Sequence, residues 1–132
     1  MNPNNFTDTG MIRVLVVDDH QIVRQGIVNI INNQPGIRVV GEAGNGREAL
    51  DLTRQLRPDV VVMDLSIPDM DGVEVTYRIK ADLPEVHVIG LSMYTEDKFI
   101  QSMLLAGAEA FVDKAAPSNE LLKVIHSAVG KA

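Results

Sequence analysis

The chain has 132 residues, of which 45% are hydrophobic and 23% are charged, a composition typical of one globular domain rather than of a disordered chain. Its formal net charge of −6 argues against this segment wrapping a nucleic acid by itself, because phosphate binding needs clustered lysine and arginine. The absence of cysteine excludes disulfides, thiol chemistry and cysteine-ligated metal.

Residues 1–10 are rich in Asn, Thr, Pro and Gly, and we expect them to form a disordered tail before a single domain over residues 11–132. This tail lacks the basic and then apolar pattern of a signal peptide. No apolar run reaches the ~18 residues that a membrane-spanning helix needs. We therefore expect a cytoplasmic protein that does not bind a membrane.

The rest of the chain alternates between apolar runs and helical stripes. The predicted strands are residues 12–17, 37–43, 59–64, 86–91 and 108–112. The predicted helices are residues 21–33, 47–56, 72–81, 96–106 and 117–129. Five strand–helix pairs in alternation predict an α/β fold with a doubly wound, five-stranded parallel sheet and helices on both faces.

The stretch VVVMDLSIPDMDG, from Val60 to Gly72, is the centre of the functional prediction. Its apolar run stops on the carboxylate of Asp64, as in a strand that is buried on both faces. Open α/β sheets bind their ligands at the carboxyl ends of the strands. Asp64 is therefore expected to face a ligand-binding crevice.

Other predicted strands also end on polar residues. Asp18 and Asp19 follow the first strand, Ser92 follows the fourth and Lys114 follows the fifth. Taken singly, each of these residues is most often a turn residue, a helix cap or a solvated side chain. A parallel sheet brings the carboxyl ends of its strands together, so their joint placement favours one site around Asp64.

The residue types of this site favour phosphoryl chemistry. Three carboxylates held close together repel one another unless a cation joins them, and an all-oxygen site suits Mg²⁺. The three histidines lie too far apart in the sequence to form local ligand pairs. The Lys114 ammonium and the Ser92 hydroxyl could bind phosphoryl oxygens, and Asp64 would then be the nucleophile that forms an aspartyl phosphate.

Four motifs resemble the receiver domain of two-component response regulators, over about residues 12–129. They are VLVVDDH (14–20), VVVMDLSIPDMDG (60–72), GLSMY (90–94) and GAEAFVDKAA (107–116). The segment QPGIRVVGEAGNGREAL (34–50) and the Lys-Ala-Ala end of the fourth motif resemble the NarL/FixJ (LuxR-type) subfamily in particular. The resemblance implies a flavodoxin-like, CheY-like (βα)5 fold with the strand order 2-1-3-4-5.

The resemblance also implies a role for each residue of the site. Asp64 would be the phosphoacceptor. Asp19 and Asp64 would bind Mg²⁺ directly, together with the backbone carbonyl of Ser66. Asp18 would act mainly through a water molecule, and Lys114 would contact the phosphoryl group.

Further positions are implied to control the switch. Ser92 would be the switch hydroxyl, and Phe111 stands at the aromatic switch position. Ser66 and Tyr94 would flank the attacking water and set the lifetime of the phosphate. Many receivers have a cis proline after the site lysine, whereas this chain has Ala115, and we leave the isomer of that peptide bond open.

The implied function is a phosphorylation-controlled switch in two-component signal transduction. The chain would not be an enzyme beyond its own phosphotransfer and autodephosphorylation. A sensor histidine kinase or a small phosphodonor would supply the phosphoryl group. Receivers of this subfamily usually precede a helix-turn-helix output domain that binds DNA, so we expect transcription regulation through a domain absent from this chain. A stand-alone receiver that acts through protein contacts is the alternative.

Members of this subfamily often dimerise through the first and last helices or through the face of the fourth helix. Ile22, Val23 and the last helix are candidates for such a homodimer interface, although core packing would explain the same residues.

Two other classes fit less well. A haloacid-dehalogenase-like phosphatase also uses a Mg²⁺-assisted aspartate, but it places a second aspartate two residues later, where this chain has Ser66. A flavodoxin-like cofactor binder needs a phosphate-binding loop after the first strand. Asp18 and Asp19 would repel a phosphate at that place.

Overall fold

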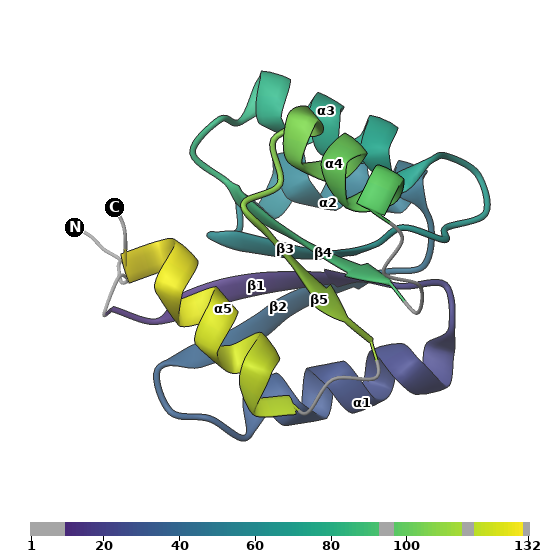
Figure 1. Cartoon of the computed structure of the whole chain (residues 1–132). Coiled ribbons are helices and arrows are strands. Elements are labelled where there is room, and N and C mark those ends of the chain that lie inside the picture. Colours follow the sequence, from purple (N-terminus) through teal and green to yellow (C-terminus); the bar gives the residue numbers. More distant parts are fainter. Residues whose placement is uncertain (1–9, 93–96, 115–117, 131–132) are drawn as a thin grey trace.

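A five-stranded parallel sheet lies between two layers of helices in the computed structural model, which describes residues 10–92, 97–114 and 118–130 (Figure 1). The strands are β1 (Ile12–Val17), β2 (Ile37–Ala43), β3 (Val60–Asp64), β4 (His87–Ser92) and β5 (Ala110–Asp113). The helices are α1 (Gln21–Asn32), α2 (Gly46–Leu56), α3 (Gly72–Asp82), α4 (Asp97–Ala106) and α5 (Ser118–Gly130). The order β2-β1-β3-β4-β5, with every pair parallel, confirms the predicted doubly wound fold.

Most strand positions are apolar because both faces of the sheet are covered by helices. Figure 1 shows α1 and α5 on one face, and α2, α3 and α4 on the other. The buried strand residues on the α1/α5 face include Val14, Val16, Val60, Val62, Ile89, Leu91 and Val112. Those on the other face include Leu15, Val17, Val61, Met63 and Val88. Neighbouring residues of a strand thus enter different cores, as the two-residue period of a strand requires.

The helices begin in different ways. Asn45 caps α2 by accepting the backbone N–H of Glu48 at 2.9 Å, and Asp71 caps α3 in the same manner. The N-cap residue of α1 is His20, whose side chain makes no capping hydrogen bond. Asp18 Oδ1 accepts the backbone N–H of His20 at 2.9 Å, so Asp18 also supports the turn that leads into α1.

The strand β5 begins two residues later than the sequence pattern predicts. Gly107 has a φ of +115°, and its N–H donates to the carbonyl of Leu104. The N–H of Ala108 then donates to the carbonyl of Met103, so both residues complete the end of α4. Ala108 therefore belongs to the helix cap rather than to the strand.

The strands place their carboxyl ends at one edge of the sheet, because all of them run in parallel. The register pairs Val17 with Met63, and Asp64 with Leu91. The residues that follow β1 therefore come next to the end of β3. The start of β1 and the end of α5 lie at the opposite edge (Figure 1).

Candidate functional site

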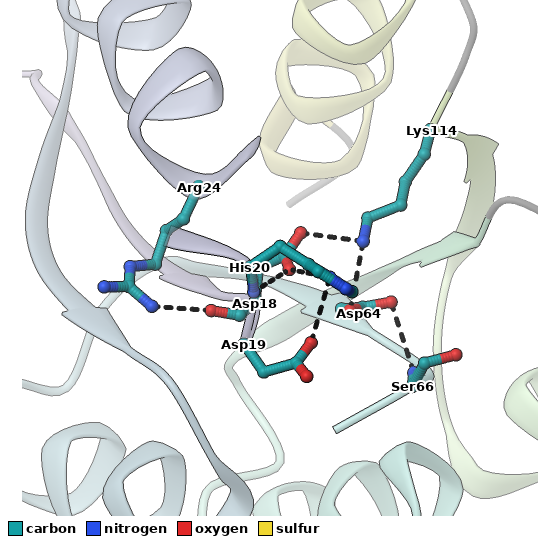
Figure 2. A network of polar contacts seen from close by, with 7 residues as sticks. All are labelled: Asp18, Asp19, His20, Arg24, Asp64, Ser66 and Lys114. Atoms are coloured by element: carbon teal, nitrogen blue, oxygen red, sulfur yellow. Dashed lines mark hydrogen bonds and ion pairs between the residues drawn. The ribbon is translucent and has the colours of Figure 1, made fainter. Parts of the chain in front are cut away.

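Side chains from three strand ends meet at the carboxyl edge of the sheet (Figure 2). Asp18 and Asp19 follow β1 directly, and Asp64 is the last residue of β3. We call these three carboxylates the acidic cluster. Lys114 follows β5 and reaches the cluster from the other side. The structure thus brings together four residues that the sequence places up to 96 positions apart.

Lys114 bridges two buried carboxylates of the acidic cluster. Its Nζ lies 2.9 Å from Asp18 Oδ2 and 3.1 Å from Asp64 Oδ2. The side chains of Asp18 and Asp64 are 0% and 1% exposed, and that of Lys114 is 5% exposed. Because water is excluded from this pair of contacts, each charge depends on the others for its stabilisation.

The surroundings of Asp64 affect its ionisation in opposite directions. Burial raises the pKa of Asp64 above its ordinary value of 3.8, because the ionised carboxylate loses its hydration. The backbone N–H of Ser66, which donates to Asp64 Oδ1 at 3.2 Å, lowers the pKa of Asp64, as does the Lys114 ammonium. The net result is a raised pKa at the carboxylate predicted to be the nucleophile.

The same contacts act on Lys114. Burial alone would lower the pKa of Lys114, but the hydrogen bonds and charges of Asp18 and Asp64 together raise it above its ordinary value of 10.5. The lysine is thus held as an ammonium inside the site. It supplies one fixed positive charge against three carboxylates.

The acidic cluster fits a divalent cation. Three carboxylates face a single ammonium, and one possible ligand atom from each of Asp18, Asp19, His20 and Asp64 lies within 4.8 Å of the others. Among the described residues, the buried Oδ2 atom of Asp18 has no partner besides the Lys114 ammonium. Crowded carboxylate oxygens with unused lone pairs are suitable ligands for Mg²⁺.

The sequence did not predict that two basic residues, Arg24 and His20, lie beside the acidic cluster. Arg24, in α1, donates from its guanidinium to the backbone carbonyl of Asp18 at 2.7 Å and to Glu42 at 3.1 Å, and so ties α1 to the ends of β1 and β2. His20 lies with Nδ1 3.2 Å from Asp19 Oδ1. Arg24 sits in an ordinary amphipathic helix, so the sequence carries no signal for its contact.

Asp69 is a third residue that the sequence analysis did not single out. It lies in the loop after β3 and accepts the backbone N–H groups of Gly46 and Arg47 at 2.7 Å and 3.0 Å. The bond from Gly46 is the main reason why the pKa of Asp69 lies below its ordinary value of 3.8. The loop that carries Ser66 is thereby fastened to the first turn of α2.

The remaining predicted residues are placed as follows. Ser66 has an exposed side chain, and its backbone N–H contacts Asp64. Phe111 lies in β5, partly buried against the core under α2, α3 and α4. Ser92 closes β4, where its side chain is outside the described part of the structure, as are Tyr94 and Ala115 as a whole.

The strand order and the acidic cluster beside Lys114 define a class of signalling domain, the CheY-like receiver. The chain belongs to the response regulator receiver family, since the sequence model of the response regulator receiver domain matches residues 14–126. Receivers of this family are phosphoacceptor switches that bind Mg²⁺ at an acidic pocket and interact with histidine kinases. The resemblance found in the motifs is thus confirmed at the level of the family.

Individual relatives place the chain among receivers of the LuxR and NarL type. It is 41% identical over 114 residues to the response regulator protein VraR of Staphylococcus aureus, covering 86% of this chain and 54% of VraR. A LuxR-family response regulator from Aurantimonas sp. SI85-9A1 superposes with a TM-score of 0.88 at 35% identity, over 92% of this chain and 86% of that structure.

The receiver domain of NarL from Mycobacterium tuberculosis also superposes with a TM-score of 0.88, at 30% identity, over 92% of this chain and 98% of that structure. The chain spans about half the length of the curated relatives that it matches. Within the described residues, none of the helices combines the length and the apolar character needed to cross a bilayer.

Proposed function

We propose that the chain, from about residue 11 onwards, is a receiver in which Asp64 accepts a phosphoryl group from a sensor histidine kinase. The observation that carries this proposal is the buried Asp64 carboxylate, which shares the Lys114 ammonium with Asp18 at the carboxyl edge of the sheet. A buried carboxylate is poorly hydrated, so less water must be displaced before it attacks phosphorus.

The transfer forms one bond and breaks another. A carboxylate oxygen of Asp64 attacks the phosphorus atom of a phosphohistidine. The P–N bond breaks with its electron pair on the imidazole nitrogen, which takes up a proton, and Asp64 becomes an aspartyl phosphate. With acetyl phosphate as the donor, the leaving group is acetate.

The residues around Asp64 have separate roles in this step. Lys114 binds a phosphoryl oxygen and stabilises the negative charge that would otherwise face Asp18. Asp19, Asp64 and the backbone carbonyl of Ser66 would hold Mg²⁺, and Asp18 would contact it through a water molecule. When bound, this cation neutralises the phosphoryl oxygens during transfer.

Phosphorylation is proposed to move two further residues. Ser92 closes β4 one residue after Leu91, the register partner of Asp64, and its hydroxyl is proposed to be drawn toward the new phosphoryl group. Phe111 stands on β5, two positions before Asp113, and its ring would follow inward. Ser66 and Tyr94 would set the lifetime of the aspartyl phosphate through their access to the attacking water. The result is a shift between two populations of the domain.

The partners of the switch follow from its surface and its relatives. Ile22 and Val23 are 88% and 42% exposed in the first turn of α1, which starts two residues after Asp19. A kinase docked over this turn would lie next to the site, and a second copy could use the same surface in a homodimer. We further propose a cytoplasmic protein in which the receiver controls a DNA-binding output domain in transcription regulation; the curated relatives are about twice as long as this chain, which leaves room for such a domain.

The test is an intact-mass measurement after incubation with Mg²⁺ and acetyl phosphate. We expect the mass of one phosphoryl group on the wild type, and none after Asp64→Ala or in the presence of EDTA. Asp51→Asn is the matched control, because Asp51 is 61% exposed and lies outside the acidic cluster. Labelling that persists in Asp64→Ala, or that is lost equally in Asp51→Asn, would contradict Asp64 as the acceptor.

If no phosphoryl group is detected, a second measurement distinguishes a short-lived aspartyl phosphate from an inactive site. Beryllium fluoride forms a hydrolysis-resistant mimic of an aspartyl phosphate, and its bound fluorine resonances report occupancy directly. Bound fluoride in the wild type but not in Asp64→Ala would support the proposal even where no phosphate survives. Failure of both reagents on the wild type would overturn it.

A further inference from the structure

His20 faces the acidic cluster and has no part in the function proposed above. Its Nδ1 lies 3.2 Å from Asp19 Oδ1 and 3.4 Å from Asp18 Oδ1, and its side chain is 62% exposed (Figure 2). Capping of α1 does not explain this position, because the side chain makes no capping hydrogen bond. His20 follows Asp19 directly in the chain, and its backbone N–H donates to Asp18 Oδ1 at 2.9 Å, which places the imidazole beside the carboxylates.

We propose that His20 is a metal ligand of the acidic cluster and that it raises the affinity of this Mg²⁺ site for transition-metal dications. The proposal rests on the proposed function, because both use the same three carboxylates. It adds a residue that determines which metal the site prefers.

The spacing of the donor atoms supports this role. Metal–ligand bonds of about 2.1 Å at right angles place neighbouring ligand atoms about 3 Å apart. The distances from His20 Nδ1 to the two nearest carboxylate oxygens are close to that value. One oxygen from each carboxylate of the cluster and the His20 nitrogen also lie within 4.8 Å of one another. Small side-chain rotations would bring the Asp19, Asp64 and His20 donors to one ion, with Asp18 contacting it through a water molecule as proposed above.

The exposure of the ring makes such a rotation possible. With 62% of its side chain exposed, His20 can move toward the cluster without disturbing the core. Ligation through Nδ1 leaves the other ring nitrogen free to contact solvent. It requires the neutral ring with its lone pair on Nδ1, which is the form of histidine that binds metals.

The chemistry of the donor predicts selectivity. Mg²⁺ is a hard cation that prefers oxygen ligands and keeps several of its waters, so it gains little from an imidazole. Ni²⁺ binds imidazole well and stands above Mn²⁺, Fe²⁺ and Co²⁺ in the general order of affinities. Removal of His20 should therefore weaken the binding of Ni²⁺ and leave that of Mg²⁺ unchanged.

The experiment is calorimetric titration of the untagged chain with NiCl₂ and with MgCl₂. The variants are His20→Asn, Asp64→Ala, the double variant that carries both changes, and the control His126→Asn, since His126 is exposed on α5. Loss of a residue that merely orients a metal ligand costs about tenfold or more in affinity, so His20→Asn should weaken Ni²⁺ binding by at least about tenfold. His126→Asn should leave the affinity for both ions as in the wild type.

Each outcome decides the proposal. Selective loss of Ni²⁺ affinity in His20→Asn, absent when Asp64 is already replaced by alanine, establishes His20 as a ligand of this site. An equal loss for both ions shows a general electrostatic role and overturns the proposal, as does no loss at all. If the wild type binds Mg²⁺ and His20→Asn binds Ni²⁺ as tightly as the wild type does, only this inference is contradicted and the proposed function stands. If the wild type binds neither ion, the cation site of the proposed function is contradicted as well.

Discussion

The ring of Phe111 lies against the backbone of Gly90, its partner in the register between β4 and β5. A Cβ atom at Gly90 would lie 2.9 Å from Cδ2 of this ring and 3.0 Å from Cε of Met103. Real carbon atoms do not approach so closely, so any side chain at this position must displace the ring. Glycine here leaves room for the partly buried ring of Phe111 at the proposed switch position.

Gly90→Ala is therefore expected to move the Phe111 ring outward and to lower the free energy of unfolding by about 1–3 kcal/mol, the usual effect of overpacking. Urea unfolding measures the stability, and the aromatic NMR signals of Phe111 measure the position of the ring. Gly26→Ala is the control, because a Cβ at Gly26 meets no atom within 4 Å. A Gly90→Ala variant as stable as Gly26→Ala would show that the ring does not depend on this space.

Replacement of Lys114 by methionine should destabilise the fold strongly. It removes the ammonium from between Asp18 and Asp64, which are both buried, and leaves two carboxylates that repel each other. Breaking a buried pair in this way costs about 3–5 kcal/mol. Chemical unfolding measures the loss, and the exposed Lys123 gives the control variant Lys123→Met. Equal stabilities of the two variants would contradict the account of the ion pairs given above.

Mg²⁺ should raise the thermal unfolding midpoint, because it binds the folded acidic cluster and relieves the repulsion between its carboxylates. A ligand at about 100 times its Kd stabilises the folded state by about 2.7 kcal/mol. Differential scanning fluorimetry with and without EDTA measures the effect. Asp19→Asn, at a site 29% exposed, should abolish most of it, whereas Asp51→Asn should not. A stabilisation that survives Asp19→Asn in full would place the ion elsewhere.

The contribution of Asp69 to stability should depend on pH. The bonds from Gly46 and Arg47 hold the pKa of Asp69 in the folded chain below 3.8. The folded state therefore binds a proton less readily than the unfolded state, so the stabilisation is complete above pH 3.8. It is lost as the pH falls through the lower pKa of the folded state. The difference in unfolding free energy between wild type and Asp69→Asn, measured with urea at several pH values, should shrink accordingly.

An Asp69→Asn difference that stays constant down to the most acidic pH would contradict this account. Glu74→Gln is a suitable control, because Glu74 is half exposed and pairs only with Arg78 of its own helix among the described residues. No unusual acid dependence is expected from it.

The fold could be predicted from the sequence because apolar runs and helical stripes alternate, and a parallel sheet is the arrangement that buries such runs on both faces. Most boundaries agree within one residue. The start of β5 is an exception, since the helix cap formed by Gly107 and Ala108 depends on hydrogen bonds to α4 rather than on apolar pattern.

The site could be predicted in part for the same reason. A strand that stops on a polar residue shows where its carboxyl end lies, and parallel topology places such ends together, as with Asp64 and Lys114. The direction in which a side chain points could not be predicted in this way. Nothing in the sequence pattern shows that Arg24 turns back to the carbonyl of Asp18, or that Asp69 reaches across to α2. The two contacts join residues 6 and 23 positions apart in the sequence, and they form only because the side chains adopt particular rotamers.

The acidic cluster and the end of α5 lie at opposite edges of the sheet (Figure 1). A six-residue strand is about 20 Å long, so a segment joined after Gly130 would start far from a charge added to Asp64. Such a segment would sense the altered packing of the whole receiver, through an allosteric coupling free energy of about 1–3 kcal/mol. In the proposed receiver, a partner attached at this end would respond to the packing of the domain, so the same change at Asp64 could act on partners of different kinds.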